Sequence, residues 1–122
     1  MLFRSHFVYQ DGSTVFKHAV KGMLESTEKL MVKNNLNINN LDLFIPHQAN
    51  KRIIDLTREK IGLPNDKVFI NIDQYANTTA ATIPICLVDA HNQKRIKQND
   101  KIIMTAFGAG FTCGSIYMKW GL

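Results

Sequence analysis

Three short segments carry groups suited to stabilising a negatively charged oxygen. His47 follows Pro46, Asn77 precedes two threonines, and Gly-Ala-Gly spans residues 108–110. A neutral imidazole and a carboxamide can each donate one hydrogen bond to an oxyanion. Glycines leave backbone amides open to a reacting carbonyl, because little side chain stands in the way. These residue types therefore suit a reaction in which charge develops on an oxygen.

Each of these segments also has an ordinary structural interpretation. A histidine after a proline is often a turn residue, Asn-Thr before a helix is often a cap, and Gly-Ala-Gly between strands is often a tight turn. All three segments follow predicted strands, however, and two lead directly into helices. Strand carboxyl ends in open α/β sheets and helix amino ends both favour bound ligands or anions. All three segments are expected at the same edge of the sheet, which favours a functional site but does not indicate which reaction it catalyses.

Hydrophobic periodicity predicts the elements that must position these segments. Three helices are expected, namely Thr14 to about Leu36, about Gln48 to Ile61, and Thr78 to about Asn92. Four strands are expected, namely Leu41–Ile45, Lys67–Ile72, Lys101–Phe107 and Phe111–Trp120. This order predicts an α/β fold with a mixed, mainly parallel sheet, covering helices and a final antiparallel strand pair.

Residues with special backbone preferences mark the ends of the predicted helices. Asp11 or Ser13 can cap the first helix, because short polar side chains accept hydrogen bonds from unpaired backbone amides. Gly62 and Pro64 end the second helix, since glycine permits a left-handed cap and proline blocks continuation. Pro84 removes one backbone donor, so the third helix either bends there or begins close by.

Length and composition limit the class of protein. A chain of 122 residues with 45% apolar and 20% charged residues suits one domain with a hydrophobic core, and excludes a disordered chain. No apolar run approaches the roughly 20 residues that span a bilayer, and the first residues lack the apolar core of a signal peptide. We therefore expect a soluble, cytoplasmic protein in which residues 1–10 form an extra strand or a ragged end.

Charge and cysteine content leave several partner classes open. The net charge of +5 comes with no basic tail and no aromatic interleaving of the RNA-binding kind, so nucleic acid is not expected. An acidic protein or a phosphate-bearing ligand suits the charge equally well. Cys86 and Cys113 form no CxxC pair or zinc site, and both are expected to be buried free thiols in a reducing compartment.

Three motifs carry a family resemblance. PHQANKRII at 46–54, YANTTAATIP at 75–84 and AFGAGFTCGS at 106–115 resemble, in this order, the C-terminal half of a β-ketoacyl-acyl carrier protein synthase III, of the thiolase-like superfamily. The early DGSTVFKHAV at 11–20 resembles a helix opening of the same family. The resemblance implies that residues 1–122 are a single C-terminal domain with half of a thiolase-like fold, and that the N-terminal half is absent.

The activity implied by the resemblance is a decarboxylative Claisen condensation. A short acyl-CoA is joined to malonyl-acyl carrier protein with loss of CO₂, which initiates fatty-acid synthesis, and no metal or cofactor is expected. The family uses a Cys, a His and an Asn, and the last two match His47 and Asn77. Phe107 matches an aromatic residue beside the site, Gly108 lines it, and the Ala109 amide matches an oxyanion hole for the acyl-cysteine.

The resemblance also implies partners for this chain. Arg52 matches the family's contact with acyl carrier protein, with Lys51 beside it, although a solvated helix face is the ordinary interpretation of both. The family's nucleophilic cysteine belongs to the N-terminal half, and neither Cys86 nor Cys113 replaces it. The isolated chain is therefore expected to be inactive, whereas the full-length family members are homodimers that take acyl-CoA.

Two residues depart from the family pattern, and the remaining histidines match nothing in it. Ala76 stands where the family usually has Gly, which implies strain of roughly 1 kcal/mol or more if the position needs a positive φ. Cys113 stands where the family usually has Trp. The remaining histidines are expected to be surface or partly packed residues: His6, His18 and His91.

Two other functions remain open at this point. One is a non-enzymatic thiolase-like module that binds carrier protein through Lys51 and Arg52, and the other is a related acyltransferase of secondary metabolism. Without its partner half, the chain is expected to expose apolar surface on Ile83–Val88 or on the Thr14–Leu36 helix. Such surface predicts self-association or poor solubility.

Overall fold

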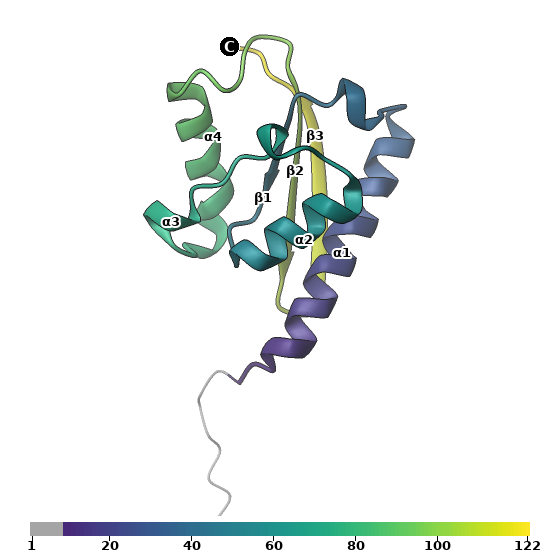
Figure 1. Cartoon of the computed structure of the whole chain (residues 1–122), viewed down its shortest axis with the longest axis vertical. Helices are drawn as coiled ribbons and strands as arrows, with labels where there is room; N and C mark the ends of the chain where they lie inside the picture. Colours follow the sequence, from purple (N-terminus) through teal and green to yellow (C-terminus); the bar gives the residue numbers. More distant parts are fainter. Residues whose placement is uncertain (1–8) are drawn as a thin grey trace, which may run out of the picture.

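A mixed sheet of three strands runs through the middle of the chain, and the computed structural model describes residues 9–122. Its strands are β1 (Leu43–Pro46), β2 (Lys101–Gly108) and β3 (Thr112–Lys119). β1 pairs with β2 in parallel, and β2 pairs with β3 in antiparallel (Figure 1). The predicted mixed sheet with a final antiparallel pair is therefore confirmed.

Helices cover both faces of this sheet. Figure 1 shows α4 (Thr82–Asn92) on one side, and α1 (Gly12–Lys33) with α2 (Lys51–Ile61) on the other. Side chains alternate across β1: Leu43 packs into a cluster with the α4 side, whereas Phe44 packs with the α2 side. This alternation buries both faces and fixes the register of the strand that leads into the site.

The helix ends follow their local chemistry. The Asp11 side chain accepts a hydrogen bond from the Thr14 N–H at 2.7 Å and caps α1, and this bond lowers the pKa of the Asp11 carboxyl. Gly62 ends α2 with a φ of 82°. Pro84 is the third residue of α4, where its missing N–H costs no helical hydrogen bond. All three sequence predictions are confirmed.

Two predicted helix starts were placed too early. α2 begins at Lys51, because Asn50 accepts a hydrogen bond from the Arg52 N–H and serves as its cap. α4 begins at Thr82, after a separate 3₁₀ turn at Thr79–Ala81. Both shifts leave short irregular segments, and these segments carry the polar residues of the candidate site.

The predicted strand at Lys67–Ile72 is wrong. Only one isolated parallel bridge forms there, between Phe44 and Val68, and Ile72 already begins the short helix α3 (Ile72–Tyr75). Beyond Phe69 the β1 backbone no longer supplies partners, and the Gln48 side chain takes their place. β1 ends at Pro46, which has no N–H to continue the pairing, and the Gln48 side chain bonds the Phe69 carbonyl and the Asn71 N–H instead, so the segment does not become a strand.

The cysteines and histidines differ in part from expectation. Cys86 is buried as predicted, whereas the prediction for Cys113 is wrong: it is exposed, because it lies on β3, an edge strand of the sheet. His18 and His91 are surface residues, as expected. His6 and most of the predicted N-terminal segment lie outside the described residues.

Exposed apolar side chains occur on both elements for which they are predicted, the Ile83–Val88 segment and the first helix. Val88 of α4 and Val32 of α1 are 58% and 77% exposed, and Ile116 of β3 adds a position that was not foreseen. The expectation of exposed apolar surface is thus confirmed, and self-association stays a prediction. No helix within residues 9–122 has the length and apolar character to cross a membrane.

Candidate active site

A cavity of about 630 Å³ lies where β1 and β2 end and α4 begins. Its lining joins residues far apart in the sequence, including His47, Asn77 and Phe107 to Ala109. A second cavity of about 430 Å³ shares these residues and extends to the start of α1. The structure therefore brings the sequence-predicted candidates His47, Asn77, Phe107, Gly108 and Ala109 to one place.

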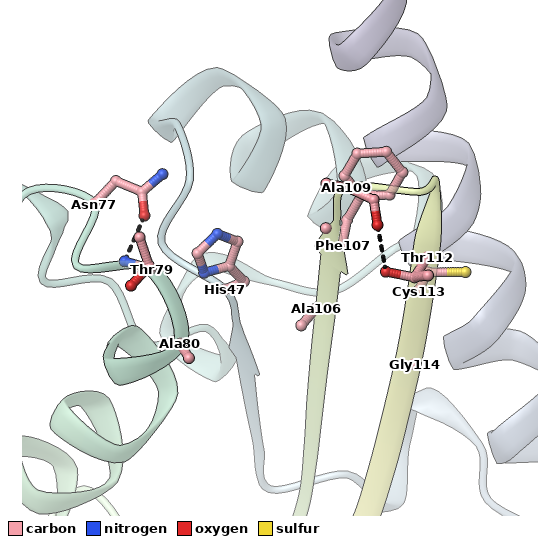
Figure 2. A pocket seen from close by; sticks show the side chains of 11 residues that line it. His47, Asn77, Thr79, Ala80, Ala106, Phe107, Ala109, Thr112, Cys113 and Gly114 are labelled. Carbon is pink, nitrogen blue, oxygen red and sulfur yellow. Dashed lines mark hydrogen bonds between the residues drawn. The ribbon is translucent and has the colours of Figure 1, made fainter. Parts of the chain in front are cut away.

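His47 is the first residue after β1, and its backbone is fixed by the sheet. The His47 N–H donates to the Thr105 carbonyl of β2 at 2.8 Å, which continues the parallel ladder. Its ring Nδ1 lies 2.6 Å from the Thr82 hydroxyl, and Thr82 is 3% exposed. Burial lowers the pKa of His47, so the neutral imidazole is favoured. The Nε2 edge is left to face the cavity (Figure 2).

Asn77 faces the same space from the other side (Figure 2). Its side-chain oxygen accepts a hydrogen bond from the Thr79 N–H at 2.9 Å. A backbone N–H can only donate, so this contact assigns the amide orientation and leaves the Nδ2 group for the cavity. Asn77 is exposed in this chain, in contrast to the half-buried His47.

The backbone on both sides of Asn77 is strained. Ala76 has φ 58° and ψ −161°, a region that is essentially restricted to glycine, and Thr79 has φ 56°. The prediction that Ala76 carries strain if its position needs a positive φ is therefore confirmed. Strain of this kind persists where surrounding contacts hold a functional residue in place.

The turn after β2 presents a free backbone donor. The Thr112 hydroxyl donates to the Ala109 carbonyl at 3.0 Å and holds the turn (Figure 2). The Ala109 N–H has no backbone acceptor within the described residues. Gly108 and Ala109 both line the cavity, so this amide is available to a ligand oxygen. The Phe107 ring packs 5.1 Å from that of Phe111 beside it.

Neither cysteine is placed to act as a nucleophile at this cavity. Burial, with the Asp89 carboxylate as a smaller cause, raises the pKa of Cys86 to about 12, so its thiol stays protonated. The Cys113 sulfur points away from His47, toward α1 (Figure 2). No group of three or more His, Cys, Asp or Glu side chains within residues 9–122 is arranged to hold a metal ion.

The two predicted cations at the start of α2 differ in their surroundings. Lys51 donates to Asp55 at 2.7 Å in an exposed ion pair. Arg52 makes no ion pair within the described residues, and its guanidinium lies 5.5 Å from the Phe16 ring centroid. Both are on the surface rather than in the cavity, so the structure separates them from His47 and Asn77.

Sequence reasoning missed Thr82, which contacts the imidazole. It stands in a mostly apolar part of the helix predicted from Thr78 to about Asn92, and the sequence pattern assigns it no role. Its position at the first turn of α4 is a usable signal, because a hydroxyl at a helix start is commonly directed at a polar partner. The cavity thus holds two neutral side-chain N–H donors and one backbone N–H donor around a common space.

The motifs that form this cavity lie within a known family. Residues 31–120 match the family model for the 3-oxoacyl-[acyl-carrier-protein (ACP)] synthase III C-terminal domain. The chain belongs to this family. The resemblance found in the sequence is therefore confirmed, together with the α/β fold that it implied.

Similar members of the synthase III family cover almost the whole chain. It is 51% identical over 118 residues to the β-ketoacyl-[acyl-carrier-protein] synthase III of Phocaeicola vulgatus, and 46% identical over 117 residues to that of Chlorobium phaeobacteroides. These alignments cover 97% and 96% of the chain but only 35% and 36% of the relatives. The chain thus spans about a third of the length of these synthase III relatives.

Solved synthase III structures have the same fold in this region. The structure from Thermus thermophilus gives a TM-score of 0.90 at 42% identity, covering 93% of this chain and 35% of that one. The structure from Aquifex aeolicus gives 0.92 at 39% identity, covering 97% and 38%. The sheet, helices and loops described above are therefore those of a synthase III C-terminal region.

Proposed function

We propose that this chain supplies the decarboxylation site of a β-ketoacyl-acyl carrier protein synthase III. One observation carries the proposal: His47 and Asn77 face one cavity, and each has its other polar atom already engaged. Thr82 holds Nδ1 of the imidazole, and the Thr79 N–H holds the carboxamide oxygen. Each side chain therefore offers one N–H to the same space. Membership in the synthase III family supports this interpretation.

The proposed chemistry follows from where charge develops. Cleavage of the bond between the malonyl carboxylate and its α-carbon releases CO₂, and the electron pair moves into the thioester carbonyl to form an enolate. Hydrogen bonds from His47 Nε2 and Asn77 Nδ2 to that oxygen strengthen as its charge grows. They stabilise the transition state more than the ground state, which is the requirement for acceleration.

The second step uses the third donor. The enolate carbon attacks the carbonyl of an acyl-cysteine thioester, and the resulting oxyanion accepts a hydrogen bond from the Ala109 N–H. Collapse of this intermediate forms the β-ketoacyl product and expels the cysteine thiolate. The family resemblance implies that this cysteine belongs to an N-terminal half, and neither Cys86 nor Cys113 is suited to replace it. We propose, from the family resemblance, that the chain acts together with that half in a homodimer, with acyl-CoA as primer and no cofactor.

Neutral donors suit this reaction better than cations. A positively charged group would bind the malonyl carboxylate itself and stabilise the ground state as well as the transition state. The cavity lining contains no Lys or Arg within the described residues, and burial keeps the pKa of His47 low. When the Thr82 hydroxyl donates to Nδ1, the ring proton lies on Nε2, and this is the tautomer that the proposed reaction uses.

The proposed carrier-protein contact is Arg52. Arg52 and Lys51 lie in the first turn of α2, where the helix dipole disfavours positive charge, and this turn contains no acidic residue. Arg52 packs on Phe16, and Phe16 lines an apolar groove between α1 and α2 together with Lys17, Lys21 and Lys60. Positive charge in the first turn of a helix lowers the stability of the helix, and contact with an acidic protein would offset this cost. Arg52 is the stronger candidate of the two, because it forms no ion pair with any residue that the structure describes.

The test of the enzymatic proposal uses the intact enzyme that contains this chain. His47→Ala removes one enolate donor and is expected to reduce malonyl decarboxylation about 10²- to 10³-fold. Loading of the nucleophilic cysteine from acyl-CoA should continue, because the donor proposed for the acyl-cysteine oxyanion is the Ala109 N–H and not His47. Normal decarboxylation by His47→Ala would refute the proposed role.

A second candidate function is carrier-protein binding without catalysis. The cations around Arg52 favour it, because they form a surface separate from the cavity. It predicts salt-sensitive binding of acyl carrier protein by the 122-residue chain, weakened by Arg52→Ala, with no turnover by the intact protein. Decarboxylation by the intact protein would reject this alternative. A cytoplasmic location, where both thiols stay reduced, is proposed for either function.

A further inference from the structure

Gln48 is a buried polar residue that joins the two loops of the candidate site. It follows His47 directly in the sequence, yet it is only 1% exposed. Its Nε2 group donates to the Pro46 carbonyl at 2.8 Å and to the Phe69 carbonyl at 3.3 Å. Its Oε1 atom accepts from the Asn71 N–H at 3.1 Å. One side chain thus satisfies three backbone groups on two segments.

Asn71 continues this connection to α4. It is 2% exposed, and its Nδ2 group donates to the Asp89 carboxylate at 2.9 Å. Its Oδ1 atom accepts from the Cys86 thiol at 3.0 Å. Asp89 and Cys86 are both residues of α4, whose first residue, Thr82, contacts the His47 ring.

These contacts form a closed ring around the segment that carries Asn77. The ring runs from His47 to Gln48 along the chain, across to Asn71, on to α4, and back through Thr82 to the imidazole. Asn77 lies between Asn71 and Thr82 in the sequence, so both ends of its loop are tied to the His47–Gln48 pair. Backbone pairing between strands does not connect these segments, because it ends at the Phe44–Val68 bridge.

We propose that Gln48 is a positioning residue that sets the placement of the Asn77 carboxamide relative to the His47 imidazole. The proposal rests on the proposed decarboxylation function, since it assigns Gln48 an effect on that step. Gln48 touches neither the cavity nor the reacting atoms, as it is absent from the lining of both site cavities. A shift of about 1 Å in one donor is enough to reduce a rate substantially.

Replacing Gln48 with Met tests the proposal in the intact enzyme. Met has a similar length and no hydrogen-bonding amide, so the Phe69 carbonyl and the Asn71 N–H lose their shared partner. We expect kcat for decarboxylation of malonyl-acyl carrier protein to fall about 10- to 100-fold, with KM changed less than about two-fold. The matched control is Gln93→Met, which makes the same change at an exposed position and should leave both constants unchanged.

Gln48→Glu supplies a second readout, the pH dependence of kcat, measured over the pH range in which circular dichroism shows the variant to be folded. A carboxylate cannot donate to the Pro46 carbonyl, whereas a protonated carboxyl can donate there and still accept from the Asn71 N–H. Burial next to carbonyl oxygens raises the pKa of the new carboxyl. The kcat of Gln48→Glu relative to wild type should therefore rise as the pH falls from about 8 to about 6. Comparison with wild type at each pH removes the contributions of His47, Cys86 and Asp89.

The outcomes separate the two proposals. If wild-type enzyme does not decarboxylate the malonyl thioester, the proposed function fails and the role of Gln48 fails with it. If wild type is active and folded Gln48→Met retains its kcat, the positioning role alone is refuted. Should circular dichroism show that Gln48→Met is unfolded, the Gln48→Glu series decides: a constant ratio to wild type at every pH contradicts the proposal, and a rising ratio supports it.

Discussion

The segment around His47 is held by regular structure, whereas the segment around Asn77 is irregular and exposed. His47 continues the β1–β2 ladder through its N–H and has its ring against a buried hydroxyl. Asn77 stands between Ala76 and Thr79, which both have positive φ values. The two donors of one proposed site therefore differ in how their positions are determined. The sheet fixes one of them, and a few side-chain contacts fix the other.

This difference has a physical reason. A residue at a strand end inherits its position from the sheet, so its side chain can be aimed with little strain. A second donor on the facing side of the cavity must leave the preceding helix sharply, which here requires a glycine-like backbone at Ala76. The Asn77 loop is accordingly the region where substitutions should reveal most about the site.

The largest expected effect is that of Asn77→Asp in the intact enzyme. The change preserves shape but replaces the Nδ2 donor with a carboxylate oxygen, which repels an enolate. The rate of malonyl decarboxylation should fall by about 10³-fold or more, since both a donor is lost and a like charge is introduced. The decarboxylation rate of Asn77→Ala, which loses the donor alone, should fall less. Equal rates for the two variants would argue against an oxyanion at this position.

A smaller effect is expected from Thr82→Val. The substitution keeps the shape of the buried side chain but leaves His47 Nδ1 without its partner, so the Nε2–H tautomer is no longer selected. Decarboxylation should slow about 10-fold through loss of imidazole orientation. Thr57→Val is the matched control, because the Thr57 hydroxyl is buried in α2 and has no hydrogen-bond partner among residues 9–122. A similar loss in both variants would indicate a general packing effect.

Ala76→Gly should stabilise the protein. Glycine adopts φ 58° without steric cost, which relieves roughly 1–2 kcal/mol of strain against a loss of about 0.5–1 kcal/mol in backbone entropy. A net gain of up to about 1 kcal/mol should appear in denaturant unfolding. Ala80→Gly, at a position without positive φ, should lower stability instead. Destabilisation by Ala76→Gly would contradict the strained geometry.

The smallest expected effect is a pH dependence of stability from His47. Burial lowers its pKa in the folded state, so the unfolded chain takes up a proton first as the pH falls. The stabilising contribution is present above the unfolded value of about 6.5 and is lost as the pH falls through the folded value. Unfolding free energies measured across this range should depend less on pH in His47→Gln. If the unfolding free energy of His47→Gln depends on pH as strongly as that of wild type, His47 is not the source of the pH dependence.

The sequence was sufficient for most of the fold, because hydrophobic alternation and helix-capping residues are local signals. Asp11, Gly62 and Pro84 each mark an end that the structure confirms. The strand predicted at Lys67–Ile72 does not form, because Pro46 of β1 has no N–H to continue the pairing and the Gln48 side chain bonds this backbone instead. No local pattern reports such a contact.

The sequence predicts the hydrogen-bond donors of the candidate site but not the residues that hold these donors in position. His47 and Asn77 stand out by residue type and by the motifs around them, and the structure places both at one cavity. Thr82 and Gln48 were not identified, because a hydroxyl in an apolar helix and an amide after a histidine have ordinary explanations. Their roles emerge only when α4 and the Asn71 segment are brought against β1.

The central claim is that one thioester oxygen is held by two neutral donors from these two regions. A crystal structure of the intact enzyme with a non-reactive malonyl thioester analogue tests it most directly. The account predicts the thioester carbonyl oxygen about 3 Å from both His47 Nε2 and Asn77 Nδ2. A thioester oxygen bound to only one of these atoms, or bound elsewhere in the cavity, would contradict it.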